Sequence, residues 1–230
     1  MTRIAIMQPY LFPYIGYWQL MESADVFVLL DNVNFINKGY INRNYLLLNN
    51  KKERFTLELQ KSSQNKLIKD IYTGHNASKI IKTFYHAYKK SLNFDEVYQL
   101  VKYSLENTEG FNLSDLLFKS INIIKNYLFI ECDILRASDL KLTNFKNAQE
   151  RIIQICKYFD ADEYVNNISG FSLYEKNIFK DNGLNLIFLE AQISEYKQFS
   201  KEFIPGLSII DVAMFNKKTK IKKMLGEFKI

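Results

Sequence analysis

The chain has 230 residues, a net charge of +6 and a hydrophobic content of 47%, with 18 Phe, 15 Tyr and one Trp. This composition excludes a disordered or fibrous protein and is sufficient for the core of one domain, so we predict a single domain over residues 1–230. Two cysteines and two histidines exclude a disulfide framework and a four-cysteine zinc site, and we predict no metal site. No apolar run has the length of a membrane span or a secretory signal, which predicts a cytoplasmic protein with no membrane insertion.

The first part of the chain predicts a strand, a helix and a second strand. Residues 3–7 form an apolar run that ends at Gln-Pro, and Pro13 suits the first turn of a helix that ends near Ala24. Residues 25–31 form a second apolar run, and a β-α-β unit of this kind implies a parallel sheet that is covered on both faces. Residues 44–50 and 54–60 then predict a β-hairpin joined at residues 49–52.

The middle of the chain, residues 75–128, is predicted to be a helical insertion. Helical periodicity covers residues 78–90, 94–105 and 113–128. After it, strands are predicted at 130–135, 163–167 and 184–190, with helices at 147–159, 171–183, 208–216 and 217–228. The predicted fold class is therefore α/β, with a parallel-sheet, Rossmann-like (nucleotidyltransferase-like) core formed by residues 1–74 and 129–230.

The segment QPYLFPYIGY, residues 8–17, is the first candidate site, because it follows the first predicted strand. Ligands bind at the carboxyl ends of strands in open α/β sheets, and a helix start offers free N–H groups to an anion. Nucleotidyltransferases place a His-x-Gly-His type motif at this point, whereas this chain has Tyr-Ile-Gly-Tyr and lacks the histidines. The alternative is that the tyrosines only pack the helix onto the sheet. The predicted substrate-binding residues are Gln8, Tyr10, Tyr14, Gly16 and Tyr17.

The loop DNVNFINKGYINRN, residues 31–44, is the second candidate site. Its many amides suit hydrogen bonding to a sugar or ribose, which nominates Asn42 and Asn44, and Arg43 could grip a phosphate or a carboxylate. Asp31 at its start is a candidate proton acceptor. The alternative is a turn-rich loop whose asparagines bond their own backbone.

Two further segments contain polar residues for which a structural and a functional role are equally well supported. Asn166 and Asn167 end the strand predicted at 163–167, and Tyr196 and Gln198 precede the last part of the chain. Asp211 is a second candidate proton acceptor, although its spacing from Ser208 is also that of a helix-capping pair.

Nucleophilic catalysis has weak support in this sequence. Cys132 and Cys156 lie in apolar runs and read as buried, inert thiols, and His86 reads as a packing or surface residue. His75, near a predicted helix start, is the remaining general-base candidate. No Gly-x-Ser-x-Gly elbow, Walker loop, dinucleotide-binding glycine motif or His-Glu-x-x-His motif occurs.

Taken in order, these segments resemble the WbqC-like protein family. The most specific matches are IAIMQPYLFPYIGYWQL, DVFVLLDNVNFINKGYINRN and EYKQFSKEFIPGLSIIDVAMFN, and the resemblance extends over the whole chain. One departure is Gly206, where the family pattern leads us to expect a large aromatic residue. The resemblance implies a protein of O-antigen and other surface-polysaccharide clusters, encoded beside enzymes that make deoxyamino sugars. It suggests a transferase that forms an amide on the amino group of a nucleotide-linked sugar, and it supplies no catalytic set.

The residues and the resemblance together predict N-aminoacyl (glycyl) or N-acyl transfer onto a dTDP- or UDP-linked amino sugar. The other predicted partner is an activated acyl donor, either carrier-bound or a charged tRNA, and a homodimer is left open. No cofactor is predicted, but the first alternative function is a ligase that uses ATP to make its own acyl-adenylate. The second is a non-catalytic protein that binds a nucleotide sugar or scaffolds other enzymes. Nucleic-acid binding ranks last, because only five of the 31 basic residues are arginine.

Overall fold

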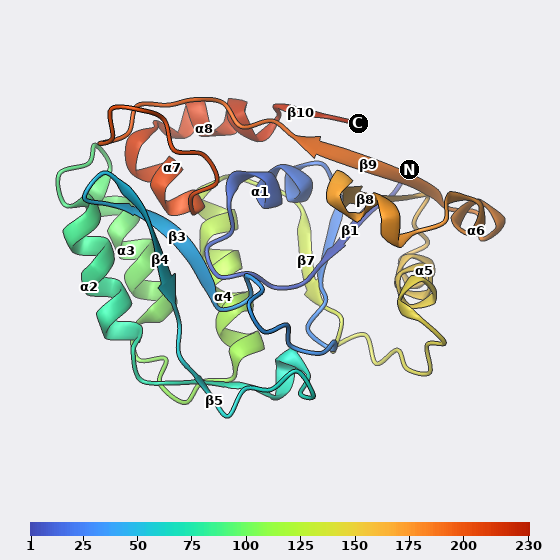
Figure 1. The fold of residues 1–230 in the computed structure, drawn as a ribbon. Helices are drawn as coiled ribbons and strands as arrows, with labels where there is room; N and C mark the ends of the chain where they lie inside the picture. The colour runs from blue at the N-terminus through green and yellow to red at the C-terminus, as the bar shows by residue number, and fades with distance from the viewer.

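The computed structural model describes residues 1–230, and a six-stranded sheet lies at its centre (Figure 1). The strands are β1 (Arg3–Met7), β2 (Val26–Leu29), β7 (Asp133–Arg136), β8 (Glu163–Asn167), β9 (Asn185–Ala191) and β10 (Phe228–Lys229). Their order across the sheet is β10-β9-β8-β1-β2-β7, and all neighbours are parallel except β10 and β9. The predicted parallel sheet is confirmed.

The order of the parallel strands is that of a Rossmann-like fold. Numbered along the chain, the five parallel strands lie in the order 3-2-1-4-5, because the chain builds outward from β1 through β2 to β7 and then returns to β8. The direction of building therefore reverses between β1 and β8. In open sheets of this kind, the crevice at the carboxyl ends of these two strands is the usual place for a ligand.

Side chains of the sheet alternate between two covered faces, as a parallel sheet requires. Ile4, Ile6 and Val28 lie in one apolar cluster with α5 (Ala148–Tyr158) and α6 (Lys176–Asp181). Ala5 and Phe27 lie in the other, larger cluster. The helices that contribute to the larger cluster are α1 (Ile15–Glu22), α2 (Ala77–Tyr88), α3 (Phe94–Leu105), α4 (Leu113–Tyr127), α7 (Ile209–Phe215) and α8 (Lys218–Leu225).

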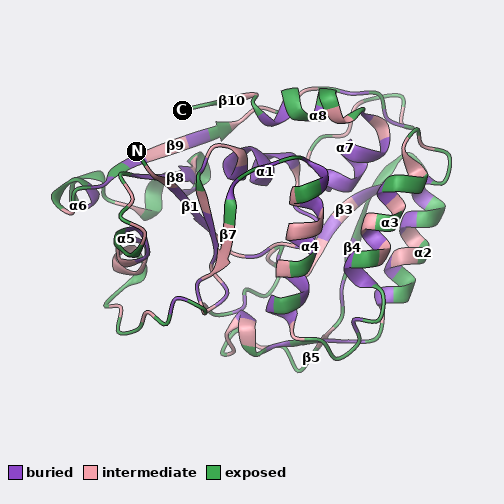
Figure 2. Ribbon diagram, turned by 180° about the vertical axis from the view of Figure 1, so that it is seen from behind, coloured by how far each residue is buried: buried purple, intermediate pink, exposed green.

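The helical insertion and the hairpin share this larger core with the sheet. The hairpin consists of β3 (Arg43–Leu48) and β4 (Lys51–Thr56), and the ring of Phe55 packs against Phe84 of α2 with centroids 5.1 Å apart. Phe12, just before α1, contacts the same Phe84 ring at 5.8 Å. Figure 2 shows buried residues continuing from the sheet into the inner sides of α2, α3 and α4. A small second pairing joins β5 (Leu59–Gln60) to β6 (Tyr72–Thr73), with a 3-10 helix η1 (Ile68–Asp70) between them.

Several predicted boundaries were wrong, each for a local reason. The hairpin turns on Asn49 and Asn50, both with positive φ, so a two-residue turn sets the register and β4 begins and ends earlier than predicted. The predicted helix at 171–183 is instead a 3-10 helix η2 (Ile168–Leu173) followed by α6, because Tyr174 is extended and packs on Tyr164. The last predicted helix ends at Leu225 and is followed by β10.

Gly206, the departure from the family pattern, has a φ of +69°. This left-handed backbone conformation favours glycine over an aromatic residue, which accounts for the substitution in this chain.

None of the helices combines the length and the apolar character that a membrane crossing requires.

Candidate functional site

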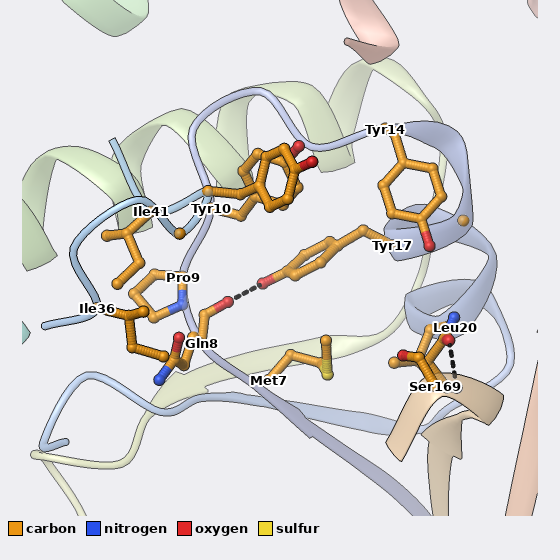
Figure 3. Close-up of a pocket in the computed structure, with 14 residues that line it drawn as sticks. Met7, Gln8, Pro9, Tyr10, Tyr14, Tyr17, Leu20, Ile36, Ile41 and Ser169 are labelled. Atoms are coloured by element: carbon orange, nitrogen blue, oxygen red, sulfur yellow. Dashed lines mark hydrogen bonds between the residues drawn. The ribbon is translucent and has the colours of Figure 1, made fainter. Parts of the chain in front are cut away.

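A pocket of about 330 Å³ opens at the carboxyl ends of β1 and β8, where the order of the sheet reverses. Its walls are the β1–α1 turn, the first part of α1, residues 36–41 and the start of η2 (Figure 3). We call it the tyrosine pocket. Six of the predicted substrate-binding residues line it, namely Gln8, Tyr10, Tyr14, Gly16, Tyr17 and Asn167.

The tyrosine side chains form a connected aromatic wall. Tyr10 contacts Tyr17 edge to face, with ring centroids 6.1 Å apart, and contacts Tyr40 at 5.3 Å. The Tyr17 hydroxyl donates a hydrogen bond of 3.3 Å to the main-chain carbonyl of Gln8, as Figure 3 shows. Burial raises the pKa of Tyr10, Tyr14 and Tyr17 above the ordinary value of 10.0. The phenols therefore stay neutral over the physiological range of pH.

The ring of Tyr14 lies directly over Gly16. A Cβ atom built on Gly16 would be 2.5 Å from Cε2 of Tyr14, which is closer than real contacts allow. Burial raises the pKa of Tyr14, and a side-chain hydrogen bond with Asn167 partly offsets that rise. This contact joins the α1 side of the pocket to the β8 side. The absence of a side chain at residue 16 thus leaves room for the Tyr14 ring against α1.

Apart from tyrosine, no ionisable side chain lines the tyrosine pocket. Its fourteen lining residues include no Asp, Glu, Lys, Arg, His or Cys. The hydrogen-bonding side chains other than the tyrosines are those of Gln8, Asn167 and Ser169. The pocket is thus suited to an uncharged polar group held against aromatic rings rather than to covalent catalysis by a side chain.

The polar residues of the 31–44 loop bond to the chain itself. Asn44 is fully buried and donates from its amide to the carbonyls of Leu11 and Phe12, and Asn42 donates to the carbonyl of Leu57 at 2.7 Å. Arg43 donates from Nε to the carbonyl of Gly39 at 2.6 Å. None of the three lines the tyrosine pocket, but their bonds fix its two adjacent wall segments.

Asn166 has a similar role in β8. Its side chain is buried, accepts a hydrogen bond from the Asn167 N–H at 2.8 Å and lies over Gly170, where a Cβ would be 2.5 Å from its amide nitrogen. Asn167 in turn accepts from the Ser169 N–H at 3.0 Å, which starts η2. The end of β8 is therefore held in a tight turn beside the pocket.

The candidate proton acceptors lie outside the tyrosine pocket. Asp31 is fully buried and accepts hydrogen bonds from the hydroxyls of Ser114 and Ser138 and from the Ser138 N–H, at 2.6–2.9 Å. His75 is exposed and pairs with Glu109. The structure does not bring either residue to the pocket.

Asp211 is the centre of a buried polar cluster. It accepts hydrogen bonds from the hydroxyl of Tyr88 at 2.7 Å, the hydroxyl of Tyr196 at 2.6 Å and the amide of Gln198 at 3.0 Å. Burial raises the pKa of Asp211 above 3.8, and its three hydrogen-bond donors oppose that rise. The predicted residues Tyr196, Gln198 and Asp211 are therefore together, but away from the tyrosine pocket.

The cysteines are also separate from the site. Both are buried, and burial raises the pKa of Cys132 and of Cys156 to about 12. A thiol of that pKa is a poor nucleophile at neutral pH. No group of three or more His, Cys, Asp or Glu side chains is placed to hold a metal ion.

Sequence reasoning missed one wall of the pocket. Ile36, Tyr40 and Ile41 line it, and Ile36 and Tyr40 are 49% and 53% exposed. The available signal was the position of these side chains in a loop that directly follows a strand of a parallel sheet, where ligands bind.

Comparison with known proteins assigns the chain to a family. The WbqC-like protein family matches residues 8–223. The chain is 24% identical to the uncharacterized protein Rv1507c of Mycobacterium tuberculosis over 220 residues, which is 94% of each chain. No solved structure matches. Because the family match covers nearly the whole chain, this protein belongs to the WbqC-like protein family.

Proposed function

We propose that the protein is a transferase that acylates the amino group of a nucleotide-linked deoxyamino sugar, with an aminoacyl group such as glycyl as the preferred acyl group. The observation that carries this proposal is the tyrosine pocket at the carboxyl ends of β1 and β8, which offers aromatic rings and amides but no ionisable catalyst other than tyrosine. Membership of the WbqC-like protein family supports the proposal through the role that the resemblance suggests for that family.

The tyrosine pocket suits one uncharged part of the sugar nucleotide, a single ring with its substituents, in size and in chemistry. A volume of about 330 Å³ accommodates one ring system with its substituents. The rings of Tyr10 and Tyr40 offer stacking surfaces, and Gln8, Asn167 and Ser169 offer hydrogen bonds to hydroxyl groups. The first N–H groups of α1, at residues 15 and 16, have no partner within the helix and suit the diphosphate.

The proposed reaction needs a neutral amine more than it needs a catalytic base. An aromatic, uncharged pocket lowers the pKa of a bound ammonium group by desolvation, which favours the nucleophilic amine. The amine nitrogen attacks the activated acyl carbon, the C–N bond forms, and the C–O or C–S bond to the donor breaks. The amine proton leaves with the departing group or through water. Correct positioning of the two reactants supplies much of the rate.

The first test is a direct assay of the purified protein. A dTDP-linked 4-amino sugar is incubated with glycine donors (glycyl-tRNA, a glycyl thioester, or glycine) with and without ATP, and the sugar nucleotide is analysed by mass spectrometry. We expect a mass gain of one glycyl unit. A product that forms only from free glycine and ATP identifies a ligase instead.

A matched pair of glycine variants links the activity to the pocket. Gly16→Ala displaces the Tyr14 ring and should weaken sugar-nucleotide binding by about tenfold or more, a loss of about 1.4 kcal/mol. Gly226→Ala, where the added Cβ meets only ordinary contacts, should bind as the wild type does. Binding of the sugar nucleotide without any product from any donor supports the non-catalytic alternative, and absence of binding contradicts the proposal.

A further inference from the structure

A second pocket, of about 340 Å³, lies between the hairpin turn and the end of α2. We call it the hairpin pocket. It is lined by Leu47–Asn50 of the hairpin, by His86, Ala87, Lys89 and Lys90 at the end of α2, and by Phe199. In Figure 1 the turn between β3 and β4 lies beside the upper end of α2, on the side of the molecule where α7 and α8 also lie.

The lining of the hairpin pocket is basic and has no carboxylate. His86, Lys89 and Lys90 are exposed at its rim, and none of its nine lining residues is acidic. Neither Lys89 nor Lys90 forms an ion pair, whereas Lys218 and Lys222 elsewhere in the molecule do. Lys51 directly follows the turn and adds a further exposed cation beside it. Lysines at a helix C-terminus complement the helix dipole, but that role needs no pocket around them.

An aromatic wall stands opposite the cations. Phe199 is 42% exposed, and its ring packs edge to face on Phe215 with centroids 4.8 Å apart. Phe215 packs in turn on Tyr88, at 6.1 Å. Phe199 is thus joined to the core through Phe215, while part of its side chain stays accessible to a ligand.

The buried Asp211 cluster holds the walls of the hairpin pocket in place. Tyr88 donates from its hydroxyl to Asp211 and accepts from the Leu47 N–H at 2.9 Å, which fastens α2 to β3. Gln198 bonds Asp211 and accepts from the Ile204 N–H at 2.9 Å, which fixes the segment that carries Phe199. Three separate chain segments are therefore preorganised around one carboxylate, as a binding site requires.

We infer that the hairpin pocket binds a phosphorylated nucleoside, with its phosphates on Lys89 and Lys90 and its base against Phe199. Lysine ammonium groups bind phosphate as point charges, and every base has a face that stacks on an aromatic ring. The two sources of this chemistry are a free nucleotide and the end of an RNA. On the basis of the proposed transfer function, we assign the activated acyl donor as the molecule that binds in the hairpin pocket.

The hairpin pocket, proposed for the acyl donor, and the tyrosine pocket, proposed for the acceptor sugar, lie at opposite ends of β3. β3 begins at Arg43, next to the wall of the tyrosine pocket, and ends at Leu48 in the hairpin pocket. Six residues of strand span about 20 Å. A donor whose phosphates rest in the hairpin pocket must therefore carry its acyl group about 20 Å away, which favours an RNA strand that is anchored a few nucleotides before its acylated end over a free nucleotide.

Binding is measured by calorimetry with ATP and with unfractionated tRNA, each at low and at moderate salt. The double variant Lys89→Glu/Lys90→Glu should weaken binding by about tenfold or more, and the salt dependence of tRNA binding should become shallower. The control is Lys79→Glu/Lys82→Glu, which makes the same charge change on two exposed lysines near the start of the same helix. It should bind as the wild type does.

Phe199→Ala separates base stacking from charge. It should weaken ATP binding by about tenfold and leave inorganic tripolyphosphate binding unchanged.

If the wild type binds tRNA but not ATP, the pocket is assigned to an RNA end. If it binds ATP, the pocket is assigned to a free nucleotide. The inference is overturned if neither ligand binds the wild type, or if both double variants weaken binding equally. Binding of the dTDP-linked sugar is measured in parallel. It should be weakened by about tenfold or more in Gly16→Ala but kept in Lys89→Glu/Lys90→Glu, so failure of one proposal is distinguishable from failure of the other.

Discussion

At the scale of single residues, one carboxylate organises a large part of the molecule. Asp211 accepts three hydrogen bonds, one from Tyr88 of α2 and two from Tyr196 and Gln198 on the segment that follows β9. Each of these donors is buried, and removal of the carboxylate leaves the hydroxyls of Tyr88 and Tyr196 without an acceptor, whereas the Gln198 amide still donates to the carbonyl of Ile204. A buried donor without a partner costs about 1–3 kcal/mol, which makes this site one of the most sensitive positions in the chain.

We predict that Asp211→Ala lowers the free energy of unfolding by about 3 kcal/mol or more and that Asp211→Asn lowers it less, by about 1–2 kcal/mol. The Asn side chain keeps one acceptor oxygen but places an N–H against the Tyr88 hydroxyl, which already accepts from Leu47. Denaturant titration measures both values. Equal and small losses in the two variants would show that the cluster is not a structural centre.

The pKa of Asp211 adds a pH dependence to this comparison. Because burial raises its pKa in the folded state above 3.8, the folded chain disfavours the ionised carboxylate. The contribution of Asp211 to stability is therefore fully present below pH 3.8 and is lost as the pH rises through the raised pKa. Asn does not titrate, so the deficit of Asp211→Asn relative to the wild type should shrink over that window.

At the scale of elements, the turn between β1 and α1 depends on the hairpin. Phe12 has a φ of +48°, which is costly for a residue with a side chain. Its carbonyl accepts hydrogen bonds from the Asn44 amide and from the Ser208 hydroxyl, and the Leu11 N–H donates to the carbonyl of Ile41 at 3.0 Å. The hairpin and the start of α7 thus hold the turn that forms the tyrosine pocket.

We predict that Asn44→Ala lowers the free energy of unfolding by about 2–3 kcal/mol, because the Leu11 and Phe12 carbonyls and the Tyr45 N–H each lose a hydrogen bond. Hydrogen exchange of the Leu11 amide should also become faster, since the turn loosens. The control is Asn122→Ala, which removes a single half-buried bond to Phe118 within α4 and should cost less than about 1 kcal/mol. Unchanged exchange at Leu11 in Asn44→Ala would contradict this role of the hairpin.

Helices and strands could be predicted from the sequence where the pattern that identifies them lies within neighbouring residues. β1 and β2 were visible as continuous apolar runs, and the five pocket residues of the β1–α1 turn followed from the position of that turn after a strand. The break between η2 and α6 was not visible, because it depends on Tyr174 packing against β8. The roles of Asn44 and Asn166 were likewise hidden, since an amide near a turn can bond a ligand or its own chain and only burial distinguishes the two.

At the scale of the whole molecule, one core joins the sheet to the helical insertion. Phe84 of α2 packs on Phe12, and Asn93 before α3 donates to the carbonyl of Ala213 in α7 at 2.8 Å. The strand order could not be predicted, because the pairing of β1 with β8 joins residues 160 positions apart, such as the ion pair of Arg3 with Glu163. No local pattern in the sequence encodes that neighbour.

We predict that the chain unfolds in a single transition despite its helical insertion. The fluorescence of Trp18, which is fully buried and donates to the carbonyl of Pro13 at 3.1 Å, reports on the sheet and α1. Far-ultraviolet circular dichroism is dominated by the helices, including α2 to α4. The two signals should give the same midpoint in denaturant, because both parts share one core. Two separated midpoints would mean that residues 75–128 form an independent domain.

The register of the hairpin has a consequence for how the length of this chain can change during evolution. Arg43 pairs with Thr56 and Leu48 with Lys51, without a bulge between them. Insertion of one residue within β3 would turn every following side chain of that strand to the opposite face and detach Leu47 from Tyr88. We therefore expect changes in length in the mostly exposed stretches 61–65 and 141–146, whereas the stretch from residue 43 to residue 56 is fixed in length.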